Sequence, residues 1–266
     1  MSIRALNTAA SGMDAMQFRL DVIANNLANA QTTAFKSSRV NFEDLYYQHF
    51  KIPGMVNQQG RPTTVGMSVG LGARVQSTEL NMAPGSLNST GGNLDLAIVG
   101  EGFFQINDGT QFLYTRAGNF SVNANGEVVL ASADQARPLE PAITIPPGTT
   151  QISISSDGIV SILQQGQTQL TQIGQIQLAQ FINPQGLLQM GQNLYSQTIG
   201  SGTPLINIPG QNGMGMVRQQ FLETSNVEPV TELVNLISTQ RTFELNAQSI
   251  QVADQAWQLV NNLRRF

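Results

Sequence analysis

Both ends of this 266-residue chain carry apolar side chains at helical spacing, and the sequence between them does not. Steps of three or four residues place side chains on one face of a helix. The N-terminal stripe comprises Ile3, Leu6, Ala10, Met13, Met16, Leu20, Ile23 and Leu27. The C-terminal stripe comprises Val230, Leu233, Ile237, Phe243, Ala247, Ile250, Trp257, Val260 and Leu263. The pattern predicts one helix at each terminus.

Neither terminal helix is expected to be stable by itself. An isolated helix is marginal in water, and most of its stability in a protein comes from packing its apolar face. Each stripe therefore needs a partner surface, which is either the other terminus or a neighbouring subunit. We expect the two helices to form a coiled-coil-like core through which copies of the chain assemble.

The composition favours a protein that packs against copies of itself. Hydrophobic residues make up 41% of the chain, but charged residues make up only 11%, and Asn and Gln supply much of the remaining polarity. A surface with few charges is poorly protected against self-association. The net charge of −4 and the pI near 5.0 argue against nucleic-acid binding, which requires a basic surface.

The sequence shows no targeting segment of the usual kinds. Residues 1–20 lack the continuous apolar stretch and the small-residue cleavage site of a secretory signal peptide. No run approaches the roughly 18 apolar residues of a membrane span. The chain contains no cysteine, which excludes disulfides and thiolate metal sites. We expect a chain that stays in the cytoplasm or is exported without a cleaved signal peptide.

These features predict an α+β chain of four segments. They are an N-terminal helix over 1–34, an extended connector over 35–74, an all-β domain over 75–222 and a C-terminal helix over 223–266. In the β domain, a turn at Asn125-Gly126 predicts a hairpin, and strands at 152–154 and 159–163 flank a second turn. The alternation over 174–181 predicts one strand.

No residue pattern predicts a catalytic, cofactor or metal site. The only histidine, His49, lies in the connector, and one His without Cys cannot build a His-based metal site or readily support a catalytic triad. Turn chemistry explains Asp95 and Asp157. Paired carboxylates nevertheless leave a glycoside hydrolase as one alternative. A secreted β-rich adhesin is a second alternative, which regular repeats would support, and the sequence has none.

Several segments together resemble flagellar rod and hook proteins. Near the N-terminus they are residues 21–29 (DVIANNLAN) and 33–36 (TAFK); in the β domain they are 100–106 (GEGFFQI), 114–120 (YTRAGNF) and 125–126; in the C-terminal segment they are 223–227 (ETSNV), 232–234, 240–241, 244 and 246. Their order matches the family, and they span nearly the whole chain. Residues 1–9 and 164–177 are less like the family.

The resemblance implies a structural subunit and not an enzyme. Subunits of this family stack helically, with the terminal helices lining a central channel and the β domain outside, so the tube transmits torque from motor to hook and conducts exported subunits. Chain length and connector favour the distal rod of the basal body, which spans the periplasm, over the hook and proximal rod. The implied partners are copies of the chain, adjacent proximal-rod and hook-end proteins, surrounding ring proteins and the flagellar export apparatus.

The predicted assembly residues lie on the two helices and in the connector. On the helices they are Leu6, Met13, Leu20, Ile23, Asn25, Asn26, Leu27, Leu233, Ile237, Phe243, Ile250 and Trp257. For the Asn pair, helix capping and hydrogen bonding to a neighbouring helix both remain open. In the connector the residues are Phe42, Leu45, Tyr46 and Tyr47, which resemble the stretch thought to stiffen the distal rod relative to the hook. We expect no cofactor.

Overall fold

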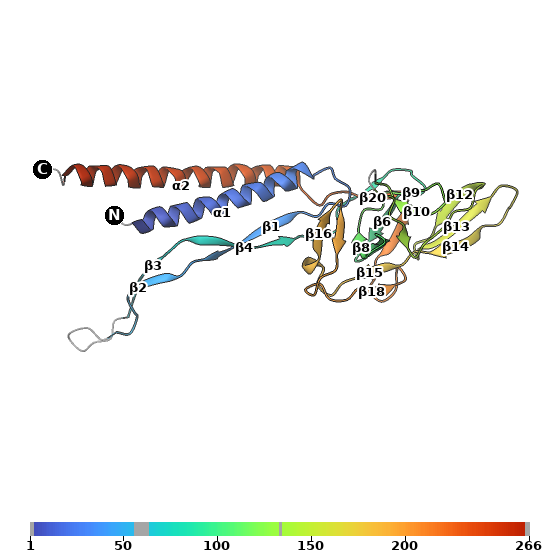
Figure 1. Cartoon of the computed structure of the whole chain (residues 1–266), viewed down its shortest axis with the longest axis horizontal. Helices are drawn as coiled ribbons and strands as arrows, with labels where there is room; N and C mark the ends of the chain where they lie inside the picture. Colours follow the sequence, from blue (N-terminus) through green and yellow to red (C-terminus); the bar gives the residue numbers. More distant parts are fainter. Residues whose placement is uncertain (1–2, 56–63, 133–134, 264–266) are drawn as a thin grey trace. The chain divides into compact units, whose positions relative to one another are not determined.

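The computed structural model describes residues 3–55, 64–132 and 135–263 and divides the chain into two compact units (Figure 1). Unit 1 draws its residues from 1–28, 38–80 and 228–266, and unit 2 draws its residues from 29–37 and 81–227. Both predicted terminal helices belong to unit 1, and the β-rich middle of the chain forms unit 2. The α+β class is therefore confirmed.

Unit 1 contains two long helices, α1 (Ile3–Ala28) and α2 (Pro229–Leu263), which pack against each other. A Cβ at Gly12 of α1 would lie 3.0 Å from Nδ2 of Asn246 on α2, so the missing side chain lets the helices approach closely. α2 begins at Pro229 and not at residue 223. Proline suits the first turn of a helix, where its missing N–H is not needed.

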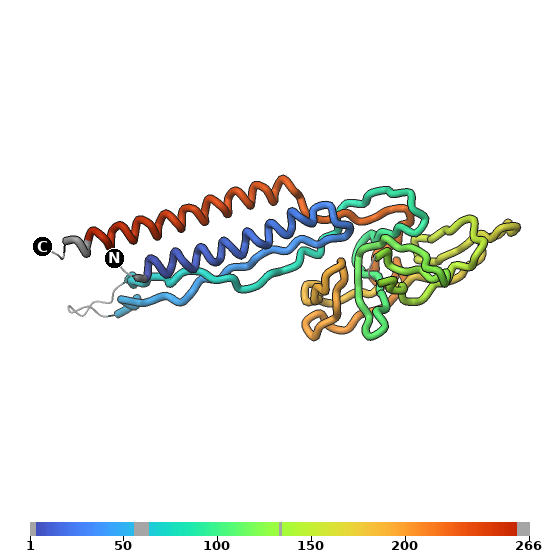
Figure 2. Tube along the Cα trace, turned by 45° about the horizontal axis from the view of Figure 1, so that its top comes forward, coloured from blue at the N-terminus to red at the C-terminus, as the bar shows by residue number. Residues whose placement is uncertain are grey.

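Residues 38–51 pair with residues 67–80 as antiparallel strands in unit 1, and we call these two paired stretches the hairpin. β1 (Ser38–Asp44) pairs with β4 (Ala73–Leu80), and β2 (Tyr47–Lys51) pairs with β3 (Met67–Gly70). α1 lies between α2 and the β1–β4 pair (Figures 1 and 2). The stretch predicted as a connector thus contains paired strands, and its expected end at residue 74 falls inside β4. The β1 and β4 partners are 29 to 42 positions apart in the chain, and pairing over such a separation leaves no mark on local sequence pattern.

Unit 2 is built from short strands. Within its described residues the largest sheet has seven strands, in the order β16-β17-β8-β7-β15-β18 with β11 also paired to β7. A three-stranded sheet (β12-β13-β14) and the pairs β5–β20, β6–β19 and β9–β10 complete it. The bounds are β5 (Leu87–Ser89), β6 (Leu96–Val99), β7 (Phe103–Asn107), β8 (Phe112–Thr115), β9 (Phe120–Val122), β10 (Val128–Leu130), β11 (Leu139–Glu140), β12 (Thr149–Ile154), β13 (Ile159–Gln164), β14 (Thr171–Gln175), β15 (Leu178–Gln180), β16 (Leu188–Gly191), β17 (Leu194–Ser196), β18 (Leu205–Asn207), β19 (Met216–Gln219) and β20 (Phe221–Glu223).

The core of unit 2 lies around β7, where Phe104 and Ile106 are fully buried with Leu139 and Leu178. The rings of Phe104 and Phe120 meet edge to face with centroids 5.2 Å apart, a favourable aromatic geometry. Buried apolar side chains from several strand pairs thus hold the short strands together.

Two of the predicted strand arrangements are confirmed and one is wrong. β9 pairs with β10, and β12 pairs with β13, across the turns that the sequence indicated. The single strand predicted over 174–181 is instead two strands, β14 and β15, which join different sheets. The alternation continues through the buried Ile176 between them. Sequence alternation reports which side chains are buried, but it does not report a change of sheet.

In the part of the chain that the structure describes, neither helix is long and apolar enough to span a membrane.

Candidate assembly surface

The predicted assembly residues of α1 are largely covered within the chain. Two are buried, Ile23 and Asn26, and four are half-buried, Leu6, Met13, Leu20 and Leu27, whereas Asn25 is exposed. Of the two partner surfaces left open by the sequence, the other terminus is the one that α1 meets in the structure.

Asn26 connects three elements of unit 1. Its side-chain oxygen accepts a hydrogen bond from the backbone N–H of Ser38, at 3.0 Å, and its amide nitrogen donates to the Ser38 carbonyl at 2.8 Å. The same nitrogen donates to Oε1 of Glu232 on α2 at 3.3 Å. Asn26 therefore ties α1 to the start of β1 and to the first turns of α2.

α2 carries two stripes at helical spacing on nearly opposite sides, about 170° apart at 3.6 residues per turn. The inner stripe faces α1 and is buried or half-buried; it comprises Glu232, Leu236, Thr239, Phe243, Asn246, Ile250 and Ala253. The outer stripe comprises Val230, Val234, Ile237, Arg241, Leu245, Gln248, Val252 and Leu259, and its apolar members are 50–75% exposed. One stripe is therefore used within the chain and the other is not.

The C-terminal stripe read from the sequence combines these two sides. Leu233 and Ile237 lie toward the outer side, whereas Phe243, Ile250 and Trp257 lie on the inner side. Ile237 and Phe243 are six residues apart, which separates them by roughly 120° around the helix axis. Because α2 is apolar on two sides, the spacing of its apolar residues fits more than one helix face.

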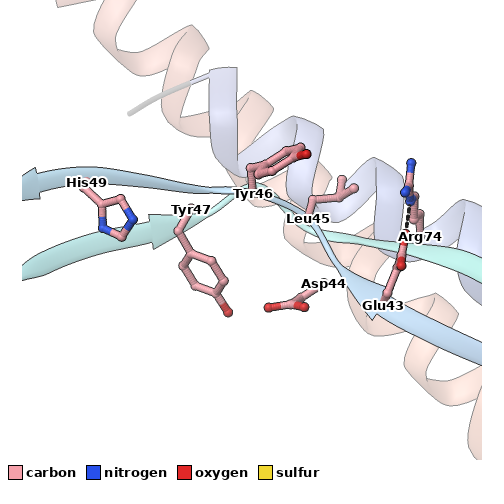
Figure 3. Close-up of a pocket in the computed structure, with 7 residues that line it drawn as sticks. All are labelled: Glu43, Asp44, Leu45, Tyr46, Tyr47, His49 and Arg74. Carbon is pink, nitrogen blue, oxygen red and sulfur yellow. Dashed lines mark hydrogen bonds and ion pairs between the residues drawn. The ribbon is translucent and has the colours of Figure 1, made fainter.

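Three of the four predicted connector residues, Leu45, Tyr46 and Tyr47, line an open pocket on the hairpin, and Phe42 does not. Phe42 and Leu45 are half-buried, but the side chain of Tyr46 is 89% exposed and that of Tyr47 is 51% exposed. The pocket has a volume of about 470 Å³ and is lined by Glu43, Asp44, Leu45, Tyr46, Tyr47, His49 and Arg74 (Figure 3).

Acidic and aromatic groups dominate this pocket. Glu43 forms an ion pair with Arg74, drawn as a dashed line in Figure 3. The hydroxyl of Tyr47 is hydrogen-bonded to the exposed carboxylate of Asp44, and this bond, with the charge of Asp44, raises the pKa of Tyr47. The two carboxylates thus outnumber the single guanidinium.

A buried ion cluster in unit 2 was not found by sequence reasoning. Nζ of Lys36 lies 2.6 Å from Oε1 of Glu223, and Nε of Arg116 lies 2.8 Å from Oε2 of the same carboxylate. The side chains of Lys36 and Glu223 have no exposed surface, and that of Arg116 is 4% exposed. The cluster therefore encloses two cations and one anion.

Backbone groups complete the cluster. Arg116 donates to the carbonyls of Ile98, Gly100 and Gly102, and Lys36 donates to the carbonyl of Ala83. The N–H of Gly85 donates to Oε1 of Glu223. Buried charges are tolerated when they are paired and fully hydrogen-bonded in this way.

The electrostatic balance of the cluster explains its pKa shifts. Burial by itself raises the pKa of Glu223, but the Arg116 and Lys36 charges and the hydrogen bonds that it accepts bring the pKa below its usual value. Burial lowers the pKa of Lys36 despite the neighbouring carboxylate. Burial, helped by the Glu223 charge, raises the pKa of Tyr195 to about 12.

The cluster joins the segments that resemble flagellar rod and hook proteins. Lys36 ends the TAFK segment, Arg116 lies in YTRAGNF and Glu223 begins ETSNV. The carbonyls that Arg116 contacts include two from the GEGFFQI segment. The sequence offered one signal for these residues, which is that charged residues are rare in this chain and that it has only two lysines. It did not show that the three residues contact one another, which only the tertiary structure shows.

Three family models match the chain, one in each part of the fold. They describe flagella basal body rod proteins at residues 6–36, the flagellar hook protein FlgE/F/G D1 domain at residues 97–162 and the flagellar basal body rod FlgEFG protein C-terminal region at residues 218–263. Each matched range contributes one member of the ion cluster, Lys36, Arg116 and Glu223 respectively.

Curated relatives match over the full length. The flagellar basal-body rod protein FlgG of Buchnera aphidicola from Acyrthosiphon pisum is 42% identical, with 98% of this chain and 100% of the relative covered. The chain belongs to the flagellar basal-body rod and hook protein family. Rod proteins named FlgG in Borreliella burgdorferi and Bacillus subtilis are 42% and 37% identical, with 99% of this chain and 99% and 100% of the relatives covered. Among family members this rod protein most resembles FlgG.

Proposed function

We propose that this chain is a structural subunit of the flagellar distal rod. Copies polymerise helically into a rigid tube that transmits torque from the motor to the hook and conducts exported subunits. The observation that carries this proposal is the full-length similarity to basal-body rod proteins, together with an apolar outer stripe on α2 that is uncovered in a single chain. A stripe of this kind gains stability when a neighbour covers it.

The predicted assembly residues divide into two groups under this proposal. Those half-buried against the partner helix hold the helices of one chain together, and the exposed ones contact other copies. The second group comprises Asn25, Leu233, Ile237, Tyr46 and Tyr47. Trp257 lies on the inner side of α2 but is 37% exposed, and we assign it to contacts with other copies as well. The chain also contacts adjacent proximal-rod and hook-end proteins, surrounding ring proteins and the export apparatus. It carries no enzymatic activity.

Immunogold electron microscopy of isolated basal bodies tests the location. A short epitope is inserted at Gly166, in the exposed turn between β13 and β14, where a side chain would meet no atom within 4 Å. We expect label on the rod segment just below the hook. Label along the hook would assign the chain to the hook instead. Absence of label from motile cells that produce the tagged protein would contradict a flagellar role.

Replacing the outer part of the hairpin is expected to make the rod bendable. The backbone N–H groups of Leu45 and Leu71 donate to the carbonyls of Gly72 and Tyr46, so the two strands are joined there. Substituting residues 46–71 by Asn-Gly, which favours a two-residue hairpin turn, keeps β1 paired with β4. It removes the exposed aromatic side chains that we propose to brace adjacent subunits, together with residues 56–63, which lie outside the described residues.

The measurement is the curvature of isolated rods in electron micrographs. The matched control replaces only Gln165–Gln167 of unit 2 by Asn-Gly, which shortens a different exposed turn and leaves the hairpin intact. We expect straight rods for the control and curved rods for the hairpin variant. Rods that assemble and remain straight without the hairpin would remove its proposed mechanical role.

A further inference from the structure

The outer stripe of α2 has a gap in its apolar pattern where Arg241 stands. Val234 and Ile237 precede it, Leu245 follows it, and a shallow groove of about 340 Å³ is lined by Val234, Ile237, Ser238, Arg241 and Thr242. Among the described residues the structure gives Arg241 no ion pair, and its side chain is exposed. The stripe thus presents an unpaired guanidinium flanked by apolar side chains.

The hairpin presents a complementary surface. Tyr46 lies opposite Leu71 and Gln48 lies opposite Val69, which places these four on one face of the β2–β3 pair. Three of the four are exposed apolar residues, and a two-stranded hairpin is marginally stable unless a face is covered. The acidic, aromatic pocket that includes Asp44 lies where β1 leads into β2, and Figure 3 shows Tyr46 directed to one side of the chain there and Asp44 and Tyr47 to the other.

The pocket has the chemistry that binds a guanidinium. The Asp44 carboxylate can accept charge-assisted hydrogen bonds from an arginine fork. Tyr46 and Tyr47 offer aromatic faces, which attract cations. Arg74, also in the pocket, is already neutralised by Glu43, so the Asp44 carboxylate has no cationic partner among the residues that the structure describes.

These two surfaces cannot meet within one copy of unit 1. The inner stripe of α2 packs on α1, which lies between α2 and the hairpin (Figures 1 and 2). The outer stripe is on the opposite side of α2 and so points away from its own hairpin. We propose that Arg241 and the outer stripe of α2 in one copy dock onto the Asp44 pocket and the β2–β3 hairpin of a second copy. This inference rests on the proposed function, since it supposes that copies polymerise.

The spacing along the two elements is compatible with this contact. α2 and β2 run toward the same end of unit 1 (Figure 1), so stacked copies with parallel helices keep that direction. Leu245 and Val252 lie about 6 Å and about 16 Å beyond Arg241 along the helix. Tyr46 and Gln48 lie about 7 Å and about 13 Å beyond Asp44 along the strand. Leu71 lies opposite Tyr46 and Val69 lies opposite Gln48, so apolar side chains of the hairpin occur at both of these strand positions.

The contact also has the symmetry that a polymer needs. It joins two different surfaces, so each copy uses its helix toward one neighbour and its hairpin toward another. Such heterologous contacts continue from copy to copy and generate rings or helical filaments, in contrast to the closed dimers of self-complementary surfaces.

Cross-linking between two single-cysteine proteins tests the contact, because the chain has no cysteine of its own. Gln48→Cys places a thiol on the hairpin, and Gln248→Cys places one on the outer stripe about 10 Å beyond Arg241 along the helix. Both positions are exposed, and both proposed charges are kept. The two full-length proteins, differing in size through a tag, are mixed and treated with a short bis-maleimide. The matched control replaces Gln248→Cys by Asp254→Cys, an exposed position about 140° around α2 from the outer stripe.

We expect at least about tenfold more mixed dimer with Gln248→Cys than with the control, because groups held in contact react at a high effective concentration. Adding Arg241→Asp to the helix protein should abolish this excess, and adding Asp44→Arg to the hairpin protein should then restore it. The proposal would be overturned by equal yields of mixed dimer for Gln248→Cys and the control. It would also be overturned by an excess that neither charge substitution changes.

Electron microscopy of the same mixtures reports polymerisation separately. Fibres without the cross-link would overturn this contact and leave the proposed function standing, whereas the cross-link without fibres would support the contact and count against the proposed function.

Discussion

Replacing Glu223 by Gln is expected to destabilise unit 2 by about 3–5 kcal/mol, the usual result of leaving a buried charge without its partner. Among the described residues, this carboxylate is the one anion that pairs with Lys36 and Arg116, whose side chains are 0% and 4% exposed. Gln keeps the shape of the side chain and removes the charge. Both cations then remain buried without compensation.

Two matched variants separate this charge effect from a general effect of substitution. Glu101→Gln changes an exposed carboxylate of unit 2 whose partner is the amide of Gln180, and it should alter the free energy of unfolding by less than about 0.5 kcal/mol. Lys36→Met removes one of the two cations and leaves the Arg116–Glu223 pair intact, so it should cost less than Glu223→Gln.

Urea unfolding measures these differences. Near-ultraviolet circular dichroism follows the buried Tyr114 and Tyr195 of unit 2, and the fluorescence of Trp257, the only tryptophan, follows α2 of unit 1. The unfolding transition that the tyrosine signal follows should have its midpoint at a lower urea concentration in Glu223→Gln. If Glu223→Gln were no more destabilising than Glu101→Gln, the cluster would not be a source of stability.

The same comparison has a defined pH dependence. The pKa of Glu223 is lower in the folded protein than in the unfolded chain, so the unfolded state binds the proton more tightly. The stability from the ionised carboxylate is therefore present above the unfolded value of about 4.3 and is lost as the pH falls through the lower folded value. The difference in the free energy of unfolding between the native protein and Glu223→Gln should become smaller below about pH 4. A difference that grows in acid would contradict this assignment.

Replacing Gly118 by Ala is expected to destabilise unit 2 by about 3 kcal/mol or more, beyond the usual cost of overpacking. A Cβ at this position would lie 1.6 Å from the carbonyl oxygen of Leu96 and 2.6 Å from its carbonyl carbon. The Leu96 N–H also donates to the Gly118 carbonyl at 2.9 Å, so the two backbones are held together. The clashing atoms belong to the backbone of the buried strand β6, so they cannot move away by a rotamer change as a flexible side chain could.

Gly200→Ala provides the control for this substitution. A Cβ there would meet only Oγ1 of Thr198 at 3.5 Å, which is ordinary van der Waals contact. We expect its urea midpoint to stay close to that of the native protein, whereas Gly118→Ala should lower the midpoint strongly or prevent folding. Equal midpoints for the two variants would show that β6 can move away from residue 118 at little cost.

The sequence by itself determined the features that depend on local pattern. Helical spacing located α1 and α2, and the Asn-Gly and Asp-Gly turns located the β9–β10 and β12–β13 pairs, because periodicity and turn chemistry act over a few residues. The order of the motif segments also identified the family. The presence of apolar residues on α2 was visible, although which side met α1 was not.

Only the tertiary structure decided how distant segments combine. It paired residues 38–44 with residues 73–80, divided 174–181 between two sheets and distributed the apolar residues of α2 between an inner and an outer stripe. It also brought Lys36, Arg116 and Glu223 together from positions up to 187 residues apart. Pairing, sheet membership and buried charge compensation depend on contacts between residues far apart in the chain, and local spacing carries no information about them.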